Sequence, residues 1–560
     1  MAQERSQAGM EKIGRNLSLI ALVVLLAIVP FETRFGALYQ SAEVAILLGV
    51  LLRLFWQARW QFWAMAGAVF VGSIAFFMGL AWICTRATQS PFTTAEIAKT
   101  LLTQVGALYF FMVVVFVGQF IFRPETWAPH DRWTRFILAL VWVFGLIVLL
   151  SAICSLNPLE SLPYVRKYLA PYVLIYMIAV ETLHSWRHYR IIITTIYLVG
   201  IIVTSASVAT RYLYIYGGYD LKSDFQKSEI LREEQLPDRE VDPATYGLSE
   251  EDLKRLGTGI PLAHQGLYPM FLPDGKMIVV KKGAVELRNQ WPFAHHNRLC
   301  SYALLVTLFV WLQFFVTRNW ELKTLVAIST IIPVWCMIVT LTRGGWIALA
   351  VGALALVLLI NWRSVWVVLA IVFAAWLVSP AVVRERLATV LRPSTYTKSE
   401  GTFHLRIHLW GWALDIIRKY PVLGLGAGWE LFEDYVKSHY PLVEPDMATS
   451  NAHNNFLEIA AESGIPAAVV FLAFTVALFA QIVRAWRTTG RQTKRRFVTA
   501  GFFALLISTT VYGLSSYSLR YTMGMLVWIC FALMTLLPTI ARAIPEEPGS
   551  APATPAATGK

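Results

Sequence analysis

The chain has 560 residues, of which 57% are hydrophobic, and it contains 21 Trp, 22 Tyr and 32 Phe. An ordinary soluble domain has a smaller apolar share, so this composition excludes a soluble globular protein and predicts an integral membrane protein. The net charge is +13. Basic residues between apolar runs are the usual cytoplasmic flanks of membrane spans, so this charge does not indicate a nucleic-acid partner.

Apolar runs recur along the chain at nearly the length that a bilayer requires. About fourteen runs approach the roughly 20 residues of a transmembrane helix, and several are short enough that two can be re-entrant or fused, which leaves twelve. The runs lie near 16–33, 41–56, 62–83, 100–122, 135–155, 168–184, 191–214, 298–317, 321–341, 345–361, 363–379, 466–484, 497–514 and 522–540. The predicted fold class is therefore an all-α polytopic membrane protein with 12 to 14 transmembrane helices.

The distribution of positive charge predicts which side each loop occupies. Arg5, Lys12 and Arg15 precede the first run, which lacks a small-residue cleavage site, so we expect an uncleaved first span with its N-terminus in the cytoplasm. Counting spans forward places the basic segment 484–496 inside and two long loops outside. The predicted units are a bundle of about seven helices at 1–214, an outer loop at 215–297, helices at 298–379, an outer loop at 380–465, helices at 466–542 and a disordered cytoplasmic tail at 543–560.

The first outer loop contains a pattern typical of strands. The segment "LPDGKMIVVKKGAVELR" alternates around Asp274-Gly275 and Lys282-Gly283, which predicts a small β-hairpin.

The second outer loop contains an amphipathic segment at 402–420 with helical periodicity. Its polar strip consists of His404, His408, Gly411, Asp415 and Arg418. Arg406 lies instead within the apolar arc, where a cation is costly unless it has a partner, so it is the residue of this helix that requires an explanation. His404 and His408 have the spacing of a metal-binding pair, but no third ligand accompanies them and no metal is expected.

Next come three glycines and then an unusually polar stretch, "TSNAHNNFLEIAAESGIP". The segment with Gly424, Gly426 and Gly428 is not a dinucleotide fingerprint, since it follows a helix, and we interpret it as a tight path close to membrane or ligand. Downstream, Ser450 or Asn451 can cap a helix, Gly464 can end it in a left-handed conformation, and Pro466 can begin the next span. His453 is thus predicted to lie on a short helix at the outer membrane surface, with Asn454 and Glu458 beside it.

Cations on the outer side run against the usual topology and point to an anionic ligand. Arg343, Arg520 and the pair Arg166-Lys167 are expected there together with Arg406. Arginine presents a planar, permanently charged fork that suits phosphate oxygens, so an anionic lipid such as a lipid pyrophosphate is the predicted ligand. Two alternatives require no specific ligand. Arg343 and Arg520 can contact ordinary lipid headgroups, and Arg166-Lys167 can be a solvated pair. His453, kept neutral by nearby arginines, suits a general base acting on a sugar hydroxyl.

The five cysteines lie in or at the ends of apolar runs: Cys84, Cys154, Cys300, Cys336 and Cys530. They are predicted to act as small hydrophobic residues, with no disulfide framework in the outer loops.

Four segments together resemble the O-antigen ligase and polymerase superfamily. They are "FAHHNRLCSYALL" (293–305), "LTRGGWIAL" (341–349), "HLRIHLWGWALDIIRKYPVLGLGAGWELF" (404–432) and "AHNNFLEIAAESGIPAAVVFLAF" (452–474), in the order expected of that superfamily. The resemblance covers about residues 293–485, and the whole chain looks like an O-antigen ligase. The long first outer loop departs from the pattern.

The resemblance implies a metal-independent membrane glycosyltransferase with a GT-C-like fold and no cofactor. It would move a completed glycan from undecaprenyl pyrophosphate onto the lipid A-core oligosaccharide, at the periplasmic face of a Gram-negative inner membrane. By position, His453 matches the family's essential histidine, and Arg343 and Arg406 match its two key arginines. Expected substrate-binding residues are Arg520, Asn454, Asn455, Glu458, Arg166, Lys167, His296 and Asn297.

Three other functions remain open at this point. A repeat-unit polymerase uses the same donor but a lipid-linked glycan as acceptor, and a protein O-oligosaccharyltransferase passes the glycan to a serine or threonine. A multi-span transporter should show polar residues at midplane depth inside its spans. The spans here are nearly free of charge, which disfavours transport.

Overall fold

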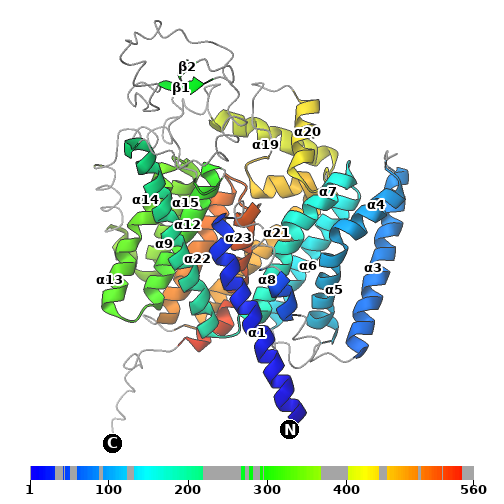
Figure 1. Ribbon diagram of the computed structural model, residues 1–560, viewed down its shortest axis with the longest axis horizontal. Coiled ribbons are helices and arrows are strands. Elements are labelled where there is room, and N and C mark those ends of the chain that lie inside the picture. Colours follow the sequence, from blue (N-terminus) through cyan, green and yellow to red (C-terminus); the bar gives the residue numbers. More distant parts are fainter. Residues whose placement is uncertain are drawn as a thin grey trace, which may run out of the picture.

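The computed structural model describes residues 2–31, 42, 44–50, 60–87, 92–122, 131–217, 267–271, 277–281, 291–293, 295–366, 377, 402–440, 451–489, 494–519 and 521–544. Within these residues the protein is a bundle of long helices that run roughly side by side, with shorter helices across one end (Figure 1).

The helices of the N-terminal half are α1 (Ala2–Ile28), η1 (Val29–Phe31), α3 (Trp60–Ala87), α4 (Thr94–Thr100), η2 (Leu101–Val105), α5 (Gly106–Phe116), η3 (Val117–Phe122), α6 (Arg132–Ile153), α7 (Pro158–Tyr164), η4 (Val165–Leu169), α8 (Ala170–Thr182) and α9 (Trp186–Gly217). Those of the C-terminal half are α12 (His296–Val316), α13 (Trp320–Ser329), α14 (Ile331–Val339), α15 (Arg343–Asn361), η6 (Trp362–Ser364), α19 (Thr402–Lys419), α20 (Trp429–His439), α21 (Asn455–Arg487), α22 (Lys494–Gly513) and α23 (Tyr521–Ala543).

Ten helical segments within the described residues are long and apolar enough to cross a bilayer. They include α6, α12, α21 and α22, and the prediction of a polytopic helical membrane protein is thereby confirmed. The span count of 12 to 14 for the whole chain stays a prediction, as do the proposed domain boundaries.

The structure contains a small hairpin, as predicted, but it lies at 267–281, so its first strand precedes the segment 272–288 in which the hairpin was expected. Strand β1 (Leu267–Phe271) pairs antiparallel with β2 (Met277–Lys281), with Phe271 opposite Met277 and Leu267 opposite Lys281. Asp274-Gly275 lies between the two strands in the sequence, as the alternation predicts. The fold is therefore not purely helical.

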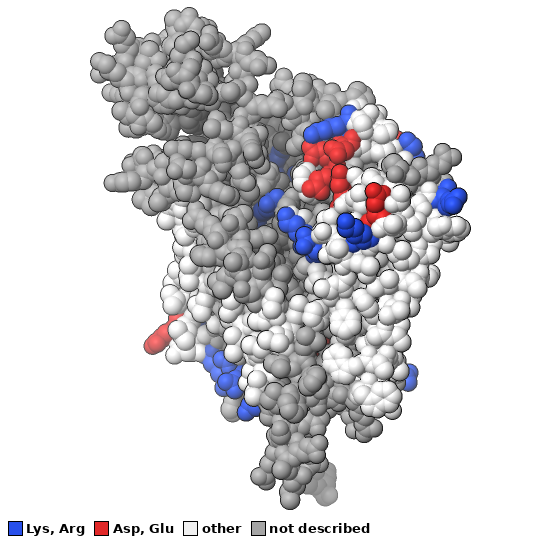
Figure 2. All heavy atoms as spheres, turned by 45° about the vertical axis from the view of Figure 1, so that its right-hand side comes forward, with Lys and Arg blue, Asp and Glu red and all other residues white. Residues whose placement is uncertain are grey.

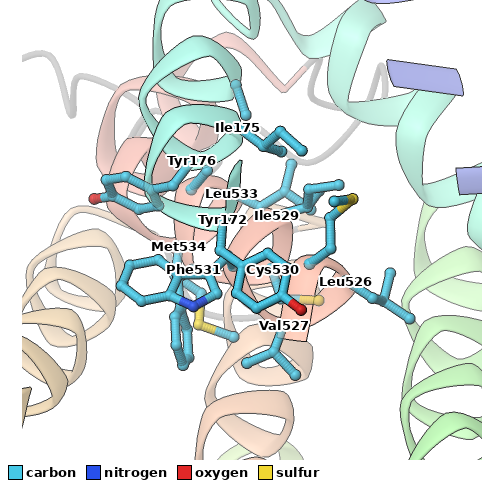
Figure 3. Packing of buried hydrophobic residues seen from close by; sticks show 14 of the residues in the cluster. Tyr172, Ile175, Tyr176, Leu526, Val527, Ile529, Cys530, Phe531, Leu533 and Met534 are labelled. Carbon is cyan, nitrogen blue, oxygen red and sulfur yellow. The ribbon is translucent and has the colours of Figure 1, made fainter. Parts of the chain in front are cut away.

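Helices α8 and α23 form the centre of the bundle. Every residue of α8 is buried, and Tyr172 and Tyr176 of α8 lie among Leu526, Ile529 and Leu533 of α23 (Figure 3). The hydroxyl of Tyr176 also lies 2.8 Å from Oγ1 of Thr535. Since lipid tails are as apolar as leucine, such close packing and interhelical hydrogen bonds hold membrane helices together.

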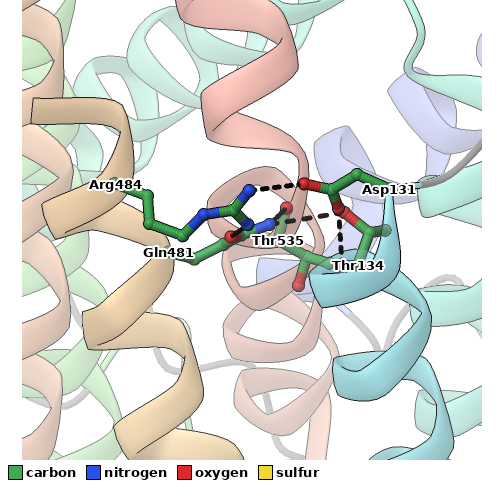
Figure 4. A network of polar contacts seen from close by, with 5 residues as sticks. All are labelled: Asp131, Thr134, Gln481, Arg484 and Thr535. Carbon is green, nitrogen blue, oxygen red and sulfur yellow. Dashed lines mark hydrogen bonds and ion pairs between the residues drawn. The ribbon is translucent and has the colours of Figure 1, made fainter. Parts of the chain in front are cut away.

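A polar network links one end of α6 to the far end of α21 (Figure 4). Nη2 of Arg484 lies 2.8 Å from Oδ2 of Asp131, and Nε2 of Gln481 donates to the carbonyl of Thr535 at 2.8 Å. The two helices are thus antiparallel. The basic segment after α21 lies at the end where α6 begins, and Asn455 lies at the end where α6 finishes.

The wall of the bundle suits a lipid environment. Figure 2 shows charged side chains gathered near the two ends, with a broad surface almost free of charge between them. Large apolar side chains are exposed on this wall, among them Val71, Ile202 and Ile331, each about two thirds exposed at 65%, 66% and 67%. Exposed apolar surface of this extent marks contact with lipid.

One cysteine differs from the sequence prediction. Cys300, Cys336 and Cys530 are free and buried, as expected of small hydrophobic residues. Cys154, directly after α6, is disulfide-bonded. The composition gave no sign of this bond because the residue lies at the end of an apolar run, where a buried thiol is the usual state.

Candidate functional site

The predicted site residues that the structure describes lie mostly at one end of the bundle. Helices α12, α15 and α21 begin there and α22 ends there, while α19 and α20 lie across this end above α21 (Figure 1). The prediction of a helix over 402–420 is confirmed by α19, and α19 packs against α21.

His453 does not lie on a helix, which corrects the prediction. It occupies a turn just before α21, in the left-handed conformation with φ +50°. Its backbone N–H donates to Oδ1 of Asn451 at 2.9 Å. The helix cap is Asn454, whose Oδ1 accepts from the N–H groups of Phe456 and Leu457 at 2.9 and 3.2 Å. The sequence predicts Ser450 or Asn451 as the cap, but the side chain of Asn451 stabilises the turn instead, and Ser450 lies outside the described residues.

A buried carboxylate holds the residue before the histidine. Glu458 is fully buried in the first turn of α21 and accepts a hydrogen bond from the backbone N–H of Ala452. A carboxylate at a helix N-terminus is also stabilised by the helix dipole. Two hydrogen bonds therefore fix the left-handed conformation at His453. Glu458 accepts from the N–H of Ala452, and Asn451 accepts from the N–H of His453 itself. Glu458 thus positions the His453 turn.

The two asparagines after His453 tie this turn to the loop between α22 and α23. Asn455 is buried, and its side chain donates to Oγ of Ser518 at 3.2 Å and accepts from the backbone N–H of Ser518 at 3.0 Å. Nδ2 of Asn454 donates to the carbonyl of Leu514 at 3.3 Å. Both were expected to bind substrate, but these hydrogen bonds give them a role in holding the turn.

The three-glycine segment runs against the backbone of α21. The N–H of Leu425 donates to the carbonyl of Ala461, and the N–H of Gly426 donates to that of Glu462, both at 3.0 Å. Helix α21 bends at Gly464, which has φ +84° as predicted. A Cβ on Gly464 would lie 2.1 Å from the carbonyl oxygen of Val422. Within the three-glycine segment, a Cβ on Gly424 would lie 2.4 Å from the carbonyl oxygen of Glu462. The close neighbour of Gly424 is therefore protein backbone, where the sequence suggested membrane or ligand.

Two arginines approach one another at this end of the bundle. Arg343 is the first residue of α15 and Arg406 lies in the second turn of α19, and both are half-buried. Burial lowers the pKa of Arg406, and the charge of Arg343 lowers it further, against an opposing contribution from Tyr512. Two guanidinium groups that repel each other in a partly desolvated place form a site for an anion.

The pKa of His453 depends on its burial and on nearby charges, including that of Arg406. Burial lowers the pKa of His453 to about 3, and the charges of Arg406 and His295 add to this effect. The imidazole is therefore uncharged at neutral pH, which is the protonation state that a general base requires. These electrostatic interactions place His453 near Arg406, and Arg406 near Arg343, at one end of the bundle.

The start of α12 lies next to the same residues. Nδ1 of His295 accepts from the backbone N–H of Asn297 at 3.1 Å, and the ring of His295 lies 4.0 Å from that of His296. The side chain of Asn297 accepts from the hydroxyl of Thr342, next to Arg343, at 3.2 Å, and its carbonyl accepts from Tyr512 at 2.7 Å. Asn297 thus connects α12, α15 and α22.

Sequence reasoning singled out His296 and Asn297 at this place and missed His295 and Tyr512. The adjacent histidines of "FAHHN" were the available signal for His295. A tyrosine at the end of an apolar run gives no comparable signal, because such residues are common at membrane interfaces.

The three other predicted binding residues are Arg166, Lys167 and Arg520. Arg166 and Lys167 are exposed on η4, and Nζ of Lys167 lies 4.9 Å from the ring centroid of Tyr168. The interactions that lower the pKa values of His453 and Arg406 do not involve either residue. Arg520 falls outside the described residues.

Comparison with protein families matches residues 328–472 to the family described as O-antigen ligase. This match supports membership of the O-antigen ligase superfamily over residues 328–472. The matched region runs from α13 into α21 and includes Arg343, Arg406 and His453. Members of the superfamily are glycosyltransferase-like ligases and polymerases that use lipid-linked glycans. No curated protein sequence matches the chain at a significant level.

Proposed function

We propose that this superfamily member is an O-antigen ligase. It transfers a polysaccharide from undecaprenyl pyrophosphate to the lipid A-core oligosaccharide, on the periplasmic side of a Gram-negative inner membrane. The observation that carries the proposal is the convergence of Arg343, Arg406 and an uncharged His453 at one end of a membrane-spanning bundle. A pyrophosphate supplies an anion that suits the two guanidinium groups, and an acceptor hydroxyl supplies the proton that the imidazole can take.

The reaction proceeds as a single displacement at the anomeric carbon of the first sugar of the donor. The acceptor oxygen forms a bond to this carbon on the face opposite the pyrophosphate, while its proton passes to His453. The bond between the carbon and the pyrophosphate oxygen breaks, and its electron pair leaves with the pyrophosphate. The anomeric configuration is inverted. The imidazolium that forms then lies close to the anionic leaving group.

The arginines act on the leaving group. Negative charge grows on the bridging oxygen as the glycosidic bond breaks, and fixed cations aimed at that position lower the barrier. A pyrophosphate held in this way leaves without protonation by a carboxylic acid. Arg343 and Arg406 thus provide the charge that a metal ion would otherwise provide, which is why we propose a metal-independent enzyme of the GT-C-like class.

Lipopolysaccharide from a strain that lacks the gene tests this assignment. We expect the loss of every glycan-bearing band on a gel and an accumulation of polymer on the lipid carrier, both reversed by the wild-type gene. A core that carries one repeat unit would identify a polymerase instead. An unchanged band pattern together with altered glycoproteins would identify a protein O-oligosaccharyltransferase.

A further inference from the structure

The last residues of α22 and the turn after it contact the starts of both α15 and α21. Helix α21 begins two residues after His453, and α15 begins with Arg343 itself. Transfer requires the base and the arginines at a fixed spacing, because a misplacement of about 1 Å can lower a rate by a factor of about 10². The segment 512–518, called the α22 end, is therefore placed where it can set that spacing.

The α22 end contacts α21 at a glycine. A Cβ on Gly513 would lie 2.4 Å from Nδ2 of Asn455, which is closer than two such atoms can approach. Asn455 cannot turn away from such a group, because two hydrogen bonds with Ser518, at 3.2 and 3.0 Å, hold its side chain. Asn454 is held as well, since it donates to the carbonyl of Leu514 at 3.3 Å. The lack of a side chain at Gly513 thus lets the start of α21 lie directly against α22.

The α22 end also contacts the start of α15, which packs along α22. A Cβ on Gly344 would lie 2.4 Å from Oγ of Ser515, so α15 and the α22 end approach closely because a side chain is absent. Tyr512 adds a link through α12. Its hydroxyl donates to the carbonyl of Asn297 at 2.7 Å, and the side chain of Asn297 accepts from Thr342, just before α15, at 3.2 Å. Two separate contacts therefore hold the start of α15 to the α22 end.

Arg406 of α19 lies close to the same segment. Burial lowers the pKa of Arg406, and the nearby Tyr512 opposes this effect. The three parts of the chain that carry the base and the two arginines therefore have one common neighbour. Residues that support reacting groups in this way keep them in the geometry that the reaction needs.

We propose that the α22 end is the positioning element of the site, with Gly513 as its principal positioning residue. It holds the turn that carries His453 and the start of α15 at the spacing that glycan transfer needs. This inference rests on the proposed function for the reaction that is positioned, while the contacts of the α22 end are independent of the chemistry.

Gly513→Ala tests the inference with a substitution that suits α22 itself. Gly513 does not have a positive φ, and alanine is a better helix former than glycine, so α22 should persist. The new Cβ displaces Asn455, and with it the residue that takes the proton. With undecaprenyl pyrophosphate-linked glycan at saturation, we expect the single-turnover rate to fall by a factor of about 10². Donor affinity should stay unchanged, because the arginines lie on other helices.

Two further variants separate positioning from general damage. The matched control is Gly79→Ala on α3, where a Cβ would meet no atom within 4 Å, and it should keep the wild-type rate. Asn455→Ala removes the atoms that the new Cβ would strike, so Gly513→Ala should cause no further loss of rate when it is added to Asn455→Ala. An equal loss from Gly513→Ala with and without the Asn455 side chain would overturn the inference.

The nitrogen NMR signal of the His453 imidazole, in the purified full-length protein, is a readout that does not depend on transfer. Gly513→Ala should shift this signal, and Gly79→Ala should leave it in place. An unshifted signal together with the wild-type rate in Gly513→Ala would also overturn the inference. A signal that shifts as expected, in a protein that transfers no glycan from undecaprenyl pyrophosphate, would refute the proposed function and leave the positioning role standing.

Discussion

Replacing His453 with asparagine is expected to lower the rate of glycan transfer by a factor of about 10²–10⁴, the usual contribution of a general base. Asparagine tolerates the left-handed conformation that residue 453 adopts at φ +50°, so the turn before α21 should persist. The asparagine side chain has no basic nitrogen, so no group at position 453 can take the proton of the acceptor hydroxyl. Binding of the lipid-linked donor should remain, because the arginines are unchanged.

Two controls separate the base from the turn. His439→Asn removes a histidine from an exposed position on α20, and full activity is expected. His453→Ala places a residue with little tolerance for the left-handed conformation in the turn, so it should lose activity and also some thermal stability. The rate of glycan transfer by the purified protein, measured together with donor binding, separates the loss of the base from a disturbance of the turn. A His453→Asn variant that transfers glycan at the wild-type rate would remove His453 from the mechanism.

Replacing Arg406 with glutamine is expected to reduce transfer by a factor of about 10²–10³, as for the loss of one preorganised group that stabilises transition-state charge. Arg406→Lys should restore only part of the rate, because an ammonium group lacks the planar fork that grips two phosphate oxygens. Donor affinity should fall as well, since the guanidinium contacts the pyrophosphate before and during bond breaking. Single-turnover rates with saturating donor separate the two effects.

The matched control for Arg406 lies on the same helix. Arg418 is exposed near the end of α19, and Arg418→Gln should leave rate and affinity unchanged. Loss of activity in both variants to the same extent would mean that α19 needs positive charge in general, and the specific role of Arg406 would be wrong.

Helix periodicity and the lengths of apolar runs predicted much of this molecule. The apolar runs became α6, α12, α21 and α22, and the amphipathic segment became α19 with Arg406 close enough to act on the pKa of His453. The bend at Gly464 also followed from local rules, because a glycine shortly before a proline marks a helix boundary. These features depend on residues that are close together in the sequence.

The features that the sequence did not predict depend on contacts between residues that are far apart in the sequence. Asn451 and Asn454 are equally good caps by residue type, and the choice of Asn454 becomes clear only from the position of Leu514 and Glu458 around the turn. Likewise, the glycines near 426 meet the backbone of α21 and the end of α6, where Leu156 donates to the carbonyl of Leu425 at 3.0 Å. No local pattern encodes such contacts, and the same holds for the disulfide at Cys154.

The most direct measurement is the titration of the His453 imidazole by nitrogen NMR in the full-length protein, assigned by difference from His453→Asn. The pKa of His453 is held at about 3 by burial, Arg406 and His295, and a group with a lowered pKa stays uncharged until the pH falls through that value. The imidazole should therefore remain neutral from about pH 8 to about pH 5. Arg406→Gln should raise the pKa, and undecaprenyl pyrophosphate should raise it in the wild type. A His453 that titrates near its ordinary pKa of about 6.5 and responds to neither change would contradict the placement of His453 beside Arg406.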